Sequence, residues 1–269
     1  MAKQKQSGAP EGKTRRQGLR ILLTNDDGVH AAGLRVLEKI ARKLTSDVWV
    51  VAPEVEQSGA SHSLTLHAPL RVRKVSRRKF VVSGTPTDCV LMALNQLIPD
   101  RKPTLLLSGV NRGANLAEDV TYSGTIAAAM EGTLLGVPSI ALSQVYRGPH
   151  SVRWSTAERH APPLIRKLLE AGWPKDVLIN INFPDIAASD VNGTEVSVQG
   201  QREAESIVIH DRLDPRRAPY YWIGFRRVVG TPPRHTDLGV IDNGGISVTP
   251  LHLDLTHRAT RKALKAALK

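Results

Sequence analysis

The sequence predicts an α/β protein: a Rossmann-like, doubly wound, mostly parallel sheet in three α/β/α layers, with a C-terminal β-rich arm. Short and almost continuously apolar runs, such as residues 19–24 (LRILLT) and 48–52 (VWVVA), are typical of parallel strands buried on both faces. These runs alternate with helix-like segments, which is the pattern of a parallel sheet covered by helices. After residue 192 the alternation stops, and strand-like segments continue without helices.

Strands and helices are expected to alternate through the first two thirds of the chain. The apolar runs that predict parallel strands are, in order, residues 19–24, 48–52, 105–107, 138–143 and 177–181. Apolar residues at helical spacing predict the intervening helices at 34–44, 87–97, 126–135 and 157–170. Right-handed crossovers between the strands would place these helices on both faces of the sheet.

Two parts of the chain depart from this alternation. Residues 64–75 alternate between apolar and polar side chains and, with 79–83, predict an antiparallel pair. Later strand-like segments, with no helix between them, are 196–198, 220–223 and 246–248. A polar stretch at 210–219 with a Pro-containing turn lies among them, so we expect a protruding arm at about 200–230. Its aromatic triplet at 220–222 indicates either a contact surface or a strand that covers its own sheet.

Composition excludes several classes of protein. The chain has 269 residues, 41% hydrophobic and 23% charged, which excludes collagen-like, low-complexity and wholly disordered proteins. No apolar run reaches the length of a membrane span. The single cysteine, Cys89, excludes an internal disulfide and indicates a reducing compartment. The first 18 residues lack the apolar stretch of a secretory signal, so we predict a cytoplasmic protein, with an Arg-rich organelle-targeting segment as the alternative.

The net charge of +12 is concentrated at the two ends of the chain. Residues 1–20 carry +5 and residues 258–269 carry another +5, which leaves +2 for everything between them. We therefore predict a basic, disordered tail at 1–18, a folded domain at 19–257, and a basic C-terminal tail or helix at 258–269. Like-charged ends usually remain solvated, and no basic folded face with interleaved aromatic residues is evident. Specific nucleic-acid binding and membrane binding are not predicted.

Polar residues follow three of the predicted strands and should meet at one edge of the sheet. Asp26 and Asp27 come after the first strand, Ser58 after the second, and Asn111 after the strand at 105–107. Ligands bind beyond the carboxyl ends of parallel strands, where these loops converge. Two adjacent carboxylates repel each other unless a cation neutralises them, and oxygen ligands of this kind suit Mg²⁺ or Mn²⁺ rather than zinc. The alternative is that one aspartate caps the following helix.

Other readings of the segment at 25–28 (NDDG) fit less well. A phosphatase of the haloacid-dehalogenase type would need a nucleophilic aspartate where this chain has Asn25, an amide. The glycine-rich turn of a dinucleotide-binding protein is absent, as is the Gly-Lys-Ser/Thr sequence of a nucleoside triphosphatase.

A second polar group begins the helix predicted at 126–135. Ser123, Gly124 and Thr125 offer hydroxyl and N–H groups at a helix N-terminus, where phosphate binds well, although a plain helix cap is the alternative. His62 is a candidate acid or base, with a structural role as the alternative. Arg112 is expected to meet either a phosphate or a neighbouring carboxylate. Cys89 is expected in the core.

Taken together, these segments resemble the survival protein E (SurE) family of metal-dependent 5'-nucleotidases. The resemblance runs from about residue 19 to 251 and rests on ILLTNDDG, VVAPEVEQSGASHS, SGTPTDCV, LSGVNRGAN, YSGTIAAAMEG, DPRRAPYYWIG and ISVTPL. It implies a SurE-like catalytic domain at 19–257 that includes the arm. It also implies catalytic Asp26 and Asp27, which bind one divalent metal ion per subunit together with Ser58 and Asn111.

The resemblance implies hydrolysis of nucleoside 5'-monophosphates to nucleoside and phosphate, with 3'-nucleotides and short polyphosphate as further substrates. Ser123, Gly124 and Thr125 would hold the phosphate, and His62 or a second water would supply the proton to the leaving oxygen. The resemblance also implies a homodimer or homotetramer assembled by exchange of C-terminal elements. The alternative function is a non-catalytic nucleotide- or RNA-binding protein that uses its basic ends.

Overall fold

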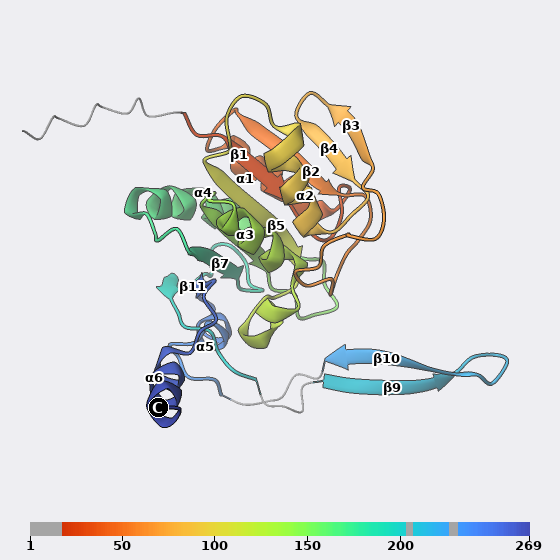
Figure 1. Cartoon of the computed structure of the whole chain (residues 1–269), viewed down its shortest axis with the longest axis vertical. Coiled ribbons are helices and arrows are strands. Elements are labelled where there is room, and N and C mark those ends of the chain that lie inside the picture. Colours follow the sequence, from red (N-terminus) through yellow and green to blue (C-terminus); the bar gives the residue numbers. More distant parts are fainter. Residues whose placement is uncertain (1–17, 203–206, 226–230) are drawn as a thin grey trace, which may run out of the picture.

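Most strands of the protein form one mixed sheet with helices on both faces (Figure 1). The computed structural model describes residues 18–202, 207–225 and 231–269. The expected tail therefore lies, up to residue 17, outside the described residues, as do two segments of the expected arm. The strands of the main sheet are β1 (Ile21–Thr24), β2 (Val48–Pro53), β3 (Val72–Ser76), β4 (Lys79–Val82), β5 (Leu105–Arg112), β6 (Ser139–Gln144), β7 (Val177–Phe183), β8 (Thr194–Val196) and β11 (Ile246–His252).

The strand order confirms the predicted doubly wound sheet. It runs β3-β4-β2-β1-β5-β6-β7-β11-β8, with the chain starting near the middle and winding outward in both directions. From β4 to β7 every neighbouring pair is parallel, whereas β3 and β11 run antiparallel to β4 and β7. Because β1 lies at the centre, both of its faces are covered, and its four residues are all buried.

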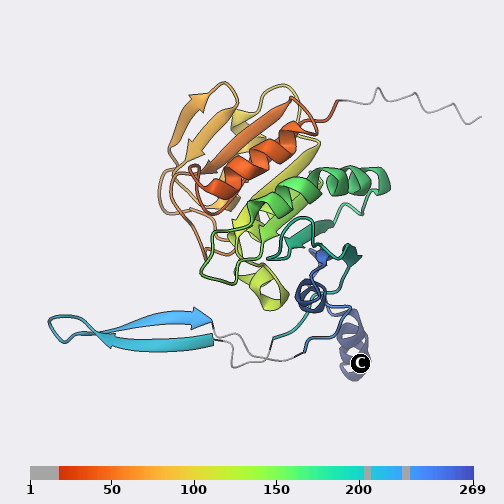
Figure 2. The same ribbon diagram turned by 180° about the vertical axis from the view of Figure 1, so that it is seen from behind.

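Helices cover both faces of the sheet. Helices α1 (Ala32–Arg42) and α4 (Trp154–Ala171) lie on the face seen in Figure 2. Helices α2 (Pro86–Met92) and α3 (Gly124–Leu134) lie on the face seen in Figure 1. Successive side chains of a strand point to opposite faces, so Leu23 packs in the core beneath α1 and α4, whereas Leu22 packs in the second core with Cys89 of α2. This three-layer arrangement is the predicted one.

Several elements differ from the sequence-based expectation. The strand expected at 105–107 continues to Arg112, which places Asn111 within a strand. The antiparallel pair exists as β3 and β4, but its first strand begins only at Val72. The helix expected at 87–97 is α2 followed by a π-helical segment, Ala93–Leu97. A further short helix, α5 (Asp237–Asp242), lies where no helix was expected, and α6 (Arg258–Ala267) is the last element.

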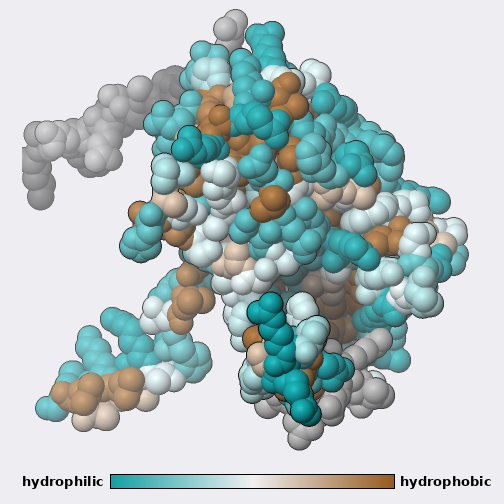
Figure 3. All heavy atoms as spheres, turned by 90° about the vertical axis from the view of Figure 1, so that its right-hand side faces the viewer, coloured by the Kyte–Doolittle hydropathy of each residue, from teal (hydrophilic) through white to brown (hydrophobic). Residues whose placement is uncertain are grey.

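A two-stranded hairpin protrudes from the body of the molecule (Figures 1 and 2). It consists of β9 (Ile207–Leu213) and β10 (Pro219–Phe225), so the stretch at 210–219, expected as a polar connection, belongs partly to strands. The side chains of Tyr221 and Trp222 are each 64% exposed, so they do not cover the sheet of their own chain. Figure 3 views the side toward which the hairpin points and shows apolar patches interrupting a hydrophilic surface.

Within the described ranges, no helix combines the length and apolar character that a membrane span requires.

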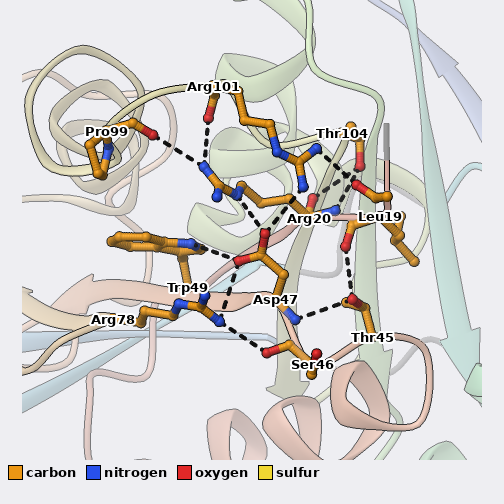
Figure 4. Close-up of polar contacts among 11 residues, drawn as sticks. Leu19, Arg20, Thr45, Ser46, Asp47, Trp49, Arg78, Pro99, Arg101 and Thr104 are labelled. Carbon is orange, nitrogen blue, oxygen red and sulfur yellow. Dashed lines mark hydrogen bonds and ion pairs between the residues drawn. The ribbon is translucent and has the colours of Figure 1, made fainter. Parts of the chain in front are cut away.

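Asp47 joins the amino ends of the central strands (Figure 4). Its carboxylate lies 2.8 Å from Nε of Arg20, 3.2 Å from Nη2 of Arg101 and 3.4 Å from Nη1 of Arg78. The side chain of Arg20 is only 10% exposed, and it also donates to the carbonyls of Pro99 and Arg101. Burial raises the pKa of Asp47, but the hydrogen bond and charge of Arg20 outweigh burial and hold the pKa below its usual value of 3.8.

We expect Asp47→Asn to lower the free energy of unfolding by about 2–3 kcal/mol at pH 7, because it leaves the buried Arg20 without a charged partner. A carboxylate with a lowered folded-state pKa stabilises the protein above pH 4 or so, and this contribution disappears as the pH falls through that pKa. The difference in free energy of unfolding between the wild type and Asp47→Asn should therefore become smaller only at acidic pH. Denaturant midpoints measured from pH 7 to pH 3 provide the test.

The matched control is Asp176→Asn, whose exposed carboxylate forms an ion pair with His252 and should affect the midpoint far less. Equal midpoints for wild type and Asp47→Asn at pH 7 would contradict the role of Asp47.

Candidate functional site

The four predicted metal ligands follow three neighbouring strands, β2, β1 and β5, at their carboxyl ends. Asp26 and Asp27 come directly after β1, Ser58 lies in the loop after β2, and Asn111 lies near the end of β5. The backbone N–H of Gln57 donates to the carbonyl of Asp26 at 2.8 Å. The structure thus brings the loop that carries Ser58 against the aspartates.

Asn111 is brought to the same place by an irregularity in β5. The register between β5 and β6 shifts between Ser108 and Asn111, and bulges of this kind re-aim the side chains that follow. Gly109 within the bulge has a φ of +131°, and a Cβ there would lie 2.2 Å from the carbonyl oxygen of Leu142, so only glycine fits. Beyond the bulge, the N–H of Arg112 donates to Oδ2 of Asp27 at 3.3 Å.

Neither aspartate caps the following helix, so that alternative is wrong. The residue at the N-cap of α1 is Ala31, and no side chain caps the helix there. Instead, Asn25 holds the turn after β1 by donating its amide to the carbonyl of Gly28 at 2.9 Å. Both aspartates therefore remain available for another purpose.

Electrostatics at this edge are unfavourable for two ionised carboxylates. Asp26 is 5% exposed, and burial raises its pKa, although the hydroxyl of Thr125 opposes this by donating to Oδ1 at 2.5 Å. Burial, and then the adjacent charge of Asp26, raises the pKa of Asp27 from 3.8 to about 6. The carboxylate of Glu56 raises both values further. A bound cation would reverse these shifts.

The donor atoms at this edge suit a hard divalent cation. Two carboxylates, a hydroxyl and an amide oxygen are all oxygen ligands. The amide nitrogen of Asn111 donates to the carbonyl of Gly113 at 3.2 Å, while its amide oxygen accepts no hydrogen bond from the described residues. The hydroxyl of Ser58 donates to Glu56 at 2.8 Å. In the part of the chain that the structure describes, no cluster of three or more His, Cys, Asp or Glu forms a metal site of another kind.

Glu56 is a residue that the sequence reasoning missed. It lies in the same loop as Ser58, two residues earlier, and it contacts that hydroxyl directly. Its position between β2 and Ser58 was visible in the sequence, but its proximity to the aspartates depends on how the loop folds back over the turn after β1.

The expected phosphate-binding residues lie against Asp26 at the N-terminus of α3. Ser123 is the helix cap, and its hydroxyl accepts from the N–H of Ile126 at 3.1 Å. Thr125 is bound to Asp26, as described above. A Cβ on Gly124 would lie 2.8 Å from Cβ of Asp26, so glycine permits the helix end to approach the carboxylate. The positive end of a helix therefore adjoins the candidate metal ligands.

His62 makes its side-chain contact farther along α3. Its Nε2 is 2.9 Å from Oε2 of Glu131, a largely buried carboxylate of α3. Glu131 follows Thr125 by six residues, which corresponds to about 9 Å along the helix axis. The structure thus pairs His62 with Glu131 rather than with the aspartates, which favours the structural alternative for this residue.

Comparison with known proteins identifies similar chains over almost the full length. The family model described as "Survival protein SurE" matches residues 21–206. The 5'-nucleotidase SurE of Parvibaculum lavamentivorans is 59% identical over 258 residues, which cover 95% of this chain and 93% of the relative. That of Paramagnetospirillum magneticum is 57% identical over 249 residues, with 93% and 95% covered.

A solved structure also matches the fold. The crystal structure of the SurE protein from Aquifex aeolicus superposes with a TM-score of 0.82 at 38% sequence identity. The match covers 93% of this chain and all of that one.

We predict that Asp27→Asn stabilises the metal-free protein. Because the pKa of Asp27 is raised in the folded state, ionisation of this carboxyl is harder there than in the unfolded chain. The free energy of unfolding therefore falls as the pH rises from about 4 to about 6. The neutral amide avoids this loss. In chelator-treated protein at pH 7.5 the variant should be more stable by about 1–2 kcal/mol, after allowance for solvent screening, and the advantage should vanish near pH 4.

Thermal unfolding with and without a divalent cation completes this test. The cation should raise the Tm of the wild type and leave that of Asp27→Asn nearly unchanged, since the variant lacks one ligand. A variant that is less stable than the wild type at pH 7.5 without metal would contradict the proposed electrostatics.

Proposed function

The chain belongs to the SurE family, and from that membership we propose that it is a metal-dependent phosphomonoesterase that hydrolyses nucleoside 5'-monophosphates to nucleoside and phosphate. The observation that carries the proposal is the pair Asp26–Asp27, held with raised pKa values beside the N-terminus of α3. Such a pair favours a cation, and the helix end favours an anion next to it. The relatives named 5'-nucleotidase SurE support the same reaction.

In this proposal Asp26, Asp27, Ser58 and Asn111 hold one Mg²⁺ or Mn²⁺ per subunit. The bound ion would supply charge neutralisation at the phosphoryl oxygens and a water of lowered pKa. Thr125 fixes the rotamer of Asp26 through its hydrogen bond, and Arg112 fixes Asp27 through its N–H.

The protein's own groups then handle the phosphate. Ser123, Gly124 and Thr125 present the first turn of α3, whose positive end would orient the phosphoryl oxygens for attack by water on phosphorus. The bond to the 5'-oxygen breaks, and this oxygen takes up a proton. Because His62 is paired with Glu131, we assign that proton to solvent water rather than to His62.

A phosphate site at a helix N-terminus recognises the phosphate rather than the group attached to it. Backbone N–H groups and hydroxyls at a helix end bind any phosphoryl group that fits the opening. We therefore propose that 3'-nucleotides and short polyphosphate are hydrolysed as well, more slowly than 5'-nucleotides. A cytoplasmic location is part of the same proposal.

Phosphate release from nucleoside monophosphates tests the proposal. Activity should require Mn²⁺ or Mg²⁺ and should be lost on chelation. Asp27→Asn should lower kcat/KM by at least about 100-fold, because it removes a charged ligand while keeping the side chain's shape. Asp176→Asn, at the opposite edge of the sheet, is the matched control and should retain the wild-type rate.

Full activity in chelator would overturn the metal mechanism. Absence of phosphate release together with salt-sensitive RNA binding would instead support the alternative, a non-catalytic binding protein that uses its basic ends.

We further propose a homodimer or homotetramer assembled through exchanged C-terminal elements. The hairpin of β9 and β10 pairs with no strand of the main sheet. Among its described side chains, large apolar ones such as Ile209 and Ile223 are mostly exposed, by 65% and 71%. A lone hairpin of this size is marginal in water, so packing against a second subunit would stabilise it.

Replacing both Tyr221 and Trp222 with serine should convert the assembly to monomers, because the change removes the exposed aromatic surface of the hairpin but leaves the main sheet intact. Light scattering at micromolar concentration measures the result. An intact chain that is itself a well-behaved monomer would contradict the proposed assembly.

A further inference from the structure

The side chains of Arg112, Tyr146 and His150 contact one another in sequence beside the candidate metal ligands. This group, called the stack below, has no role in the proposed mechanism. The guanidinium carbon of Arg112 lies 5.3 Å from the centre of the Tyr146 ring. Tyr146 in turn contacts His150 edge-on, with ring centres 5.8 Å apart and planes at 90°. Arg112 and Tyr146 are far apart in sequence, but β5 and β6 pair directly, with Arg112 opposite Gln144.

The stack adjoins the site where phosphate chemistry is proposed. Arg112 follows the candidate ligand Asn111, and its N–H donates to Asp27. Tyr146 lies two residues beyond the end of β6, at the same carboxyl edge of the sheet. A substrate whose phosphate lies at the end of α3 would therefore have the rest of its body near this stack.

Asp185, in the loop after β7, holds the residues around the stack in place. Nε2 of His150 is 3.2 Å from Oδ2 of Asp185, and the N–H of Arg147 donates to the same oxygen at 2.9 Å. The side chain of Asp185 is only 8% exposed, so it is a fixed anchor. The His150 ring is therefore held in place against Tyr146. A platform that is ordered before the ligand arrives loses little entropy on binding.

Arg112 itself is free to meet a ligand. Its side chain is exposed, and although its charge acts on Asp27, its guanidinium forms no close ion pair with a carboxylate of the described residues. A planar guanidinium supported by an aromatic ring is a surface on which nucleobases stack. Stacking of this kind tolerates any base, because every base has a π-face.

We propose that Arg112, Tyr146 and His150 form the platform that binds the nucleoside part of the substrate, with the base stacked on the guanidinium plane of Arg112, which the Tyr146 ring supports. This inference rests on the function proposed above and adds the part of the site that distinguishes a nucleotide from other phosphate esters. Since the platform offers a surface rather than an edge-reading set of donors, both purine and pyrimidine nucleotides bind, and the larger purines bind more tightly.

The test compares a nucleotide with a substrate that lacks a base. Tyr146→Ala should raise the KM for adenosine 5'-monophosphate about tenfold with little change in kcat, and leave the KM for ribose 5-phosphate within about twofold. Product inhibition gives a second readout: the Ki of adenosine should rise about tenfold, while the Ki of inorganic phosphate stays the same. Tyr146→Phe, which keeps the ring, should restore the nucleotide KM.

Arg112→Lys separates stacking from charge. Lysine keeps the positive charge but loses the plane, so it should weaken nucleotide and adenosine binding severalfold and spare inorganic phosphate. Equal weakening of nucleotide and ribose 5-phosphate, or no change in either, would overturn the platform while leaving the proposed phosphatase function intact. A wild-type protein that releases phosphate from ribose 5-phosphate but from no nucleotide overturns both.

Discussion

The repulsion between two adjacent carboxylates at the end of a buried strand is the constraint around which this site is organised. Asp26 and Asp27 follow β1, the central strand, where burial raises the pKa of both. The hydroxyl of Thr125 and the N–H of Arg112 each stabilise one carboxylate, and Gly124 lets α3 approach closely. These contacts orient the carboxylates, and the charge of Arg112 offsets part of the rise in the pKa of Asp27 without cancelling it. The proposed cation would complete the arrangement.

At the amino ends of the same strands, a carboxylate is neutralised by positive side chains of the protein itself. Asp47 is surrounded by three arginines, and its pKa is lowered. Asp27 adjoins no such cluster, and its pKa is raised to about 6. Both lie at strand ends, so position in the fold does not explain the difference; the neighbouring charges do. A carboxylate held at an electrostatic disadvantage is typical of an edge that binds a ligand, whereas a neutralised one is typical of an edge that holds the fold together.

Much of the fold and part of the site could be predicted from the sequence. Continuous apolar runs identified the parallel strands, and the convergence of loops at their carboxyl ends placed Ser58 and Asn111 near the aspartates. Helix α5 could not be predicted, because it is six residues long and depends on distant contacts: the carboxylate of Asp237 accepts from the N–H groups of Ala117 and Gly200. The contact between Arg112 and Tyr146 was equally hidden, since it arises only from the pairing of β5 with β6.

The two halves of the site come from different parts of the sheet, and this division has a consequence for specificity. The cation and phosphate contacts are assigned to the loops after β1, β2 and β5 and to the end of α3, where backbone groups and small side chains do most of the binding. Apart from Arg112 at the end of β5, the nucleoside contacts are assigned to the loop after β6, braced by Asp185 in the loop after β7. Substitutions in the loops after β6 and β7 would alter which phosphate ester is accepted without disturbing Asp26 and Asp27. Loops on a rigid sheet can vary in this way because the strands, not the loops, supply the stability.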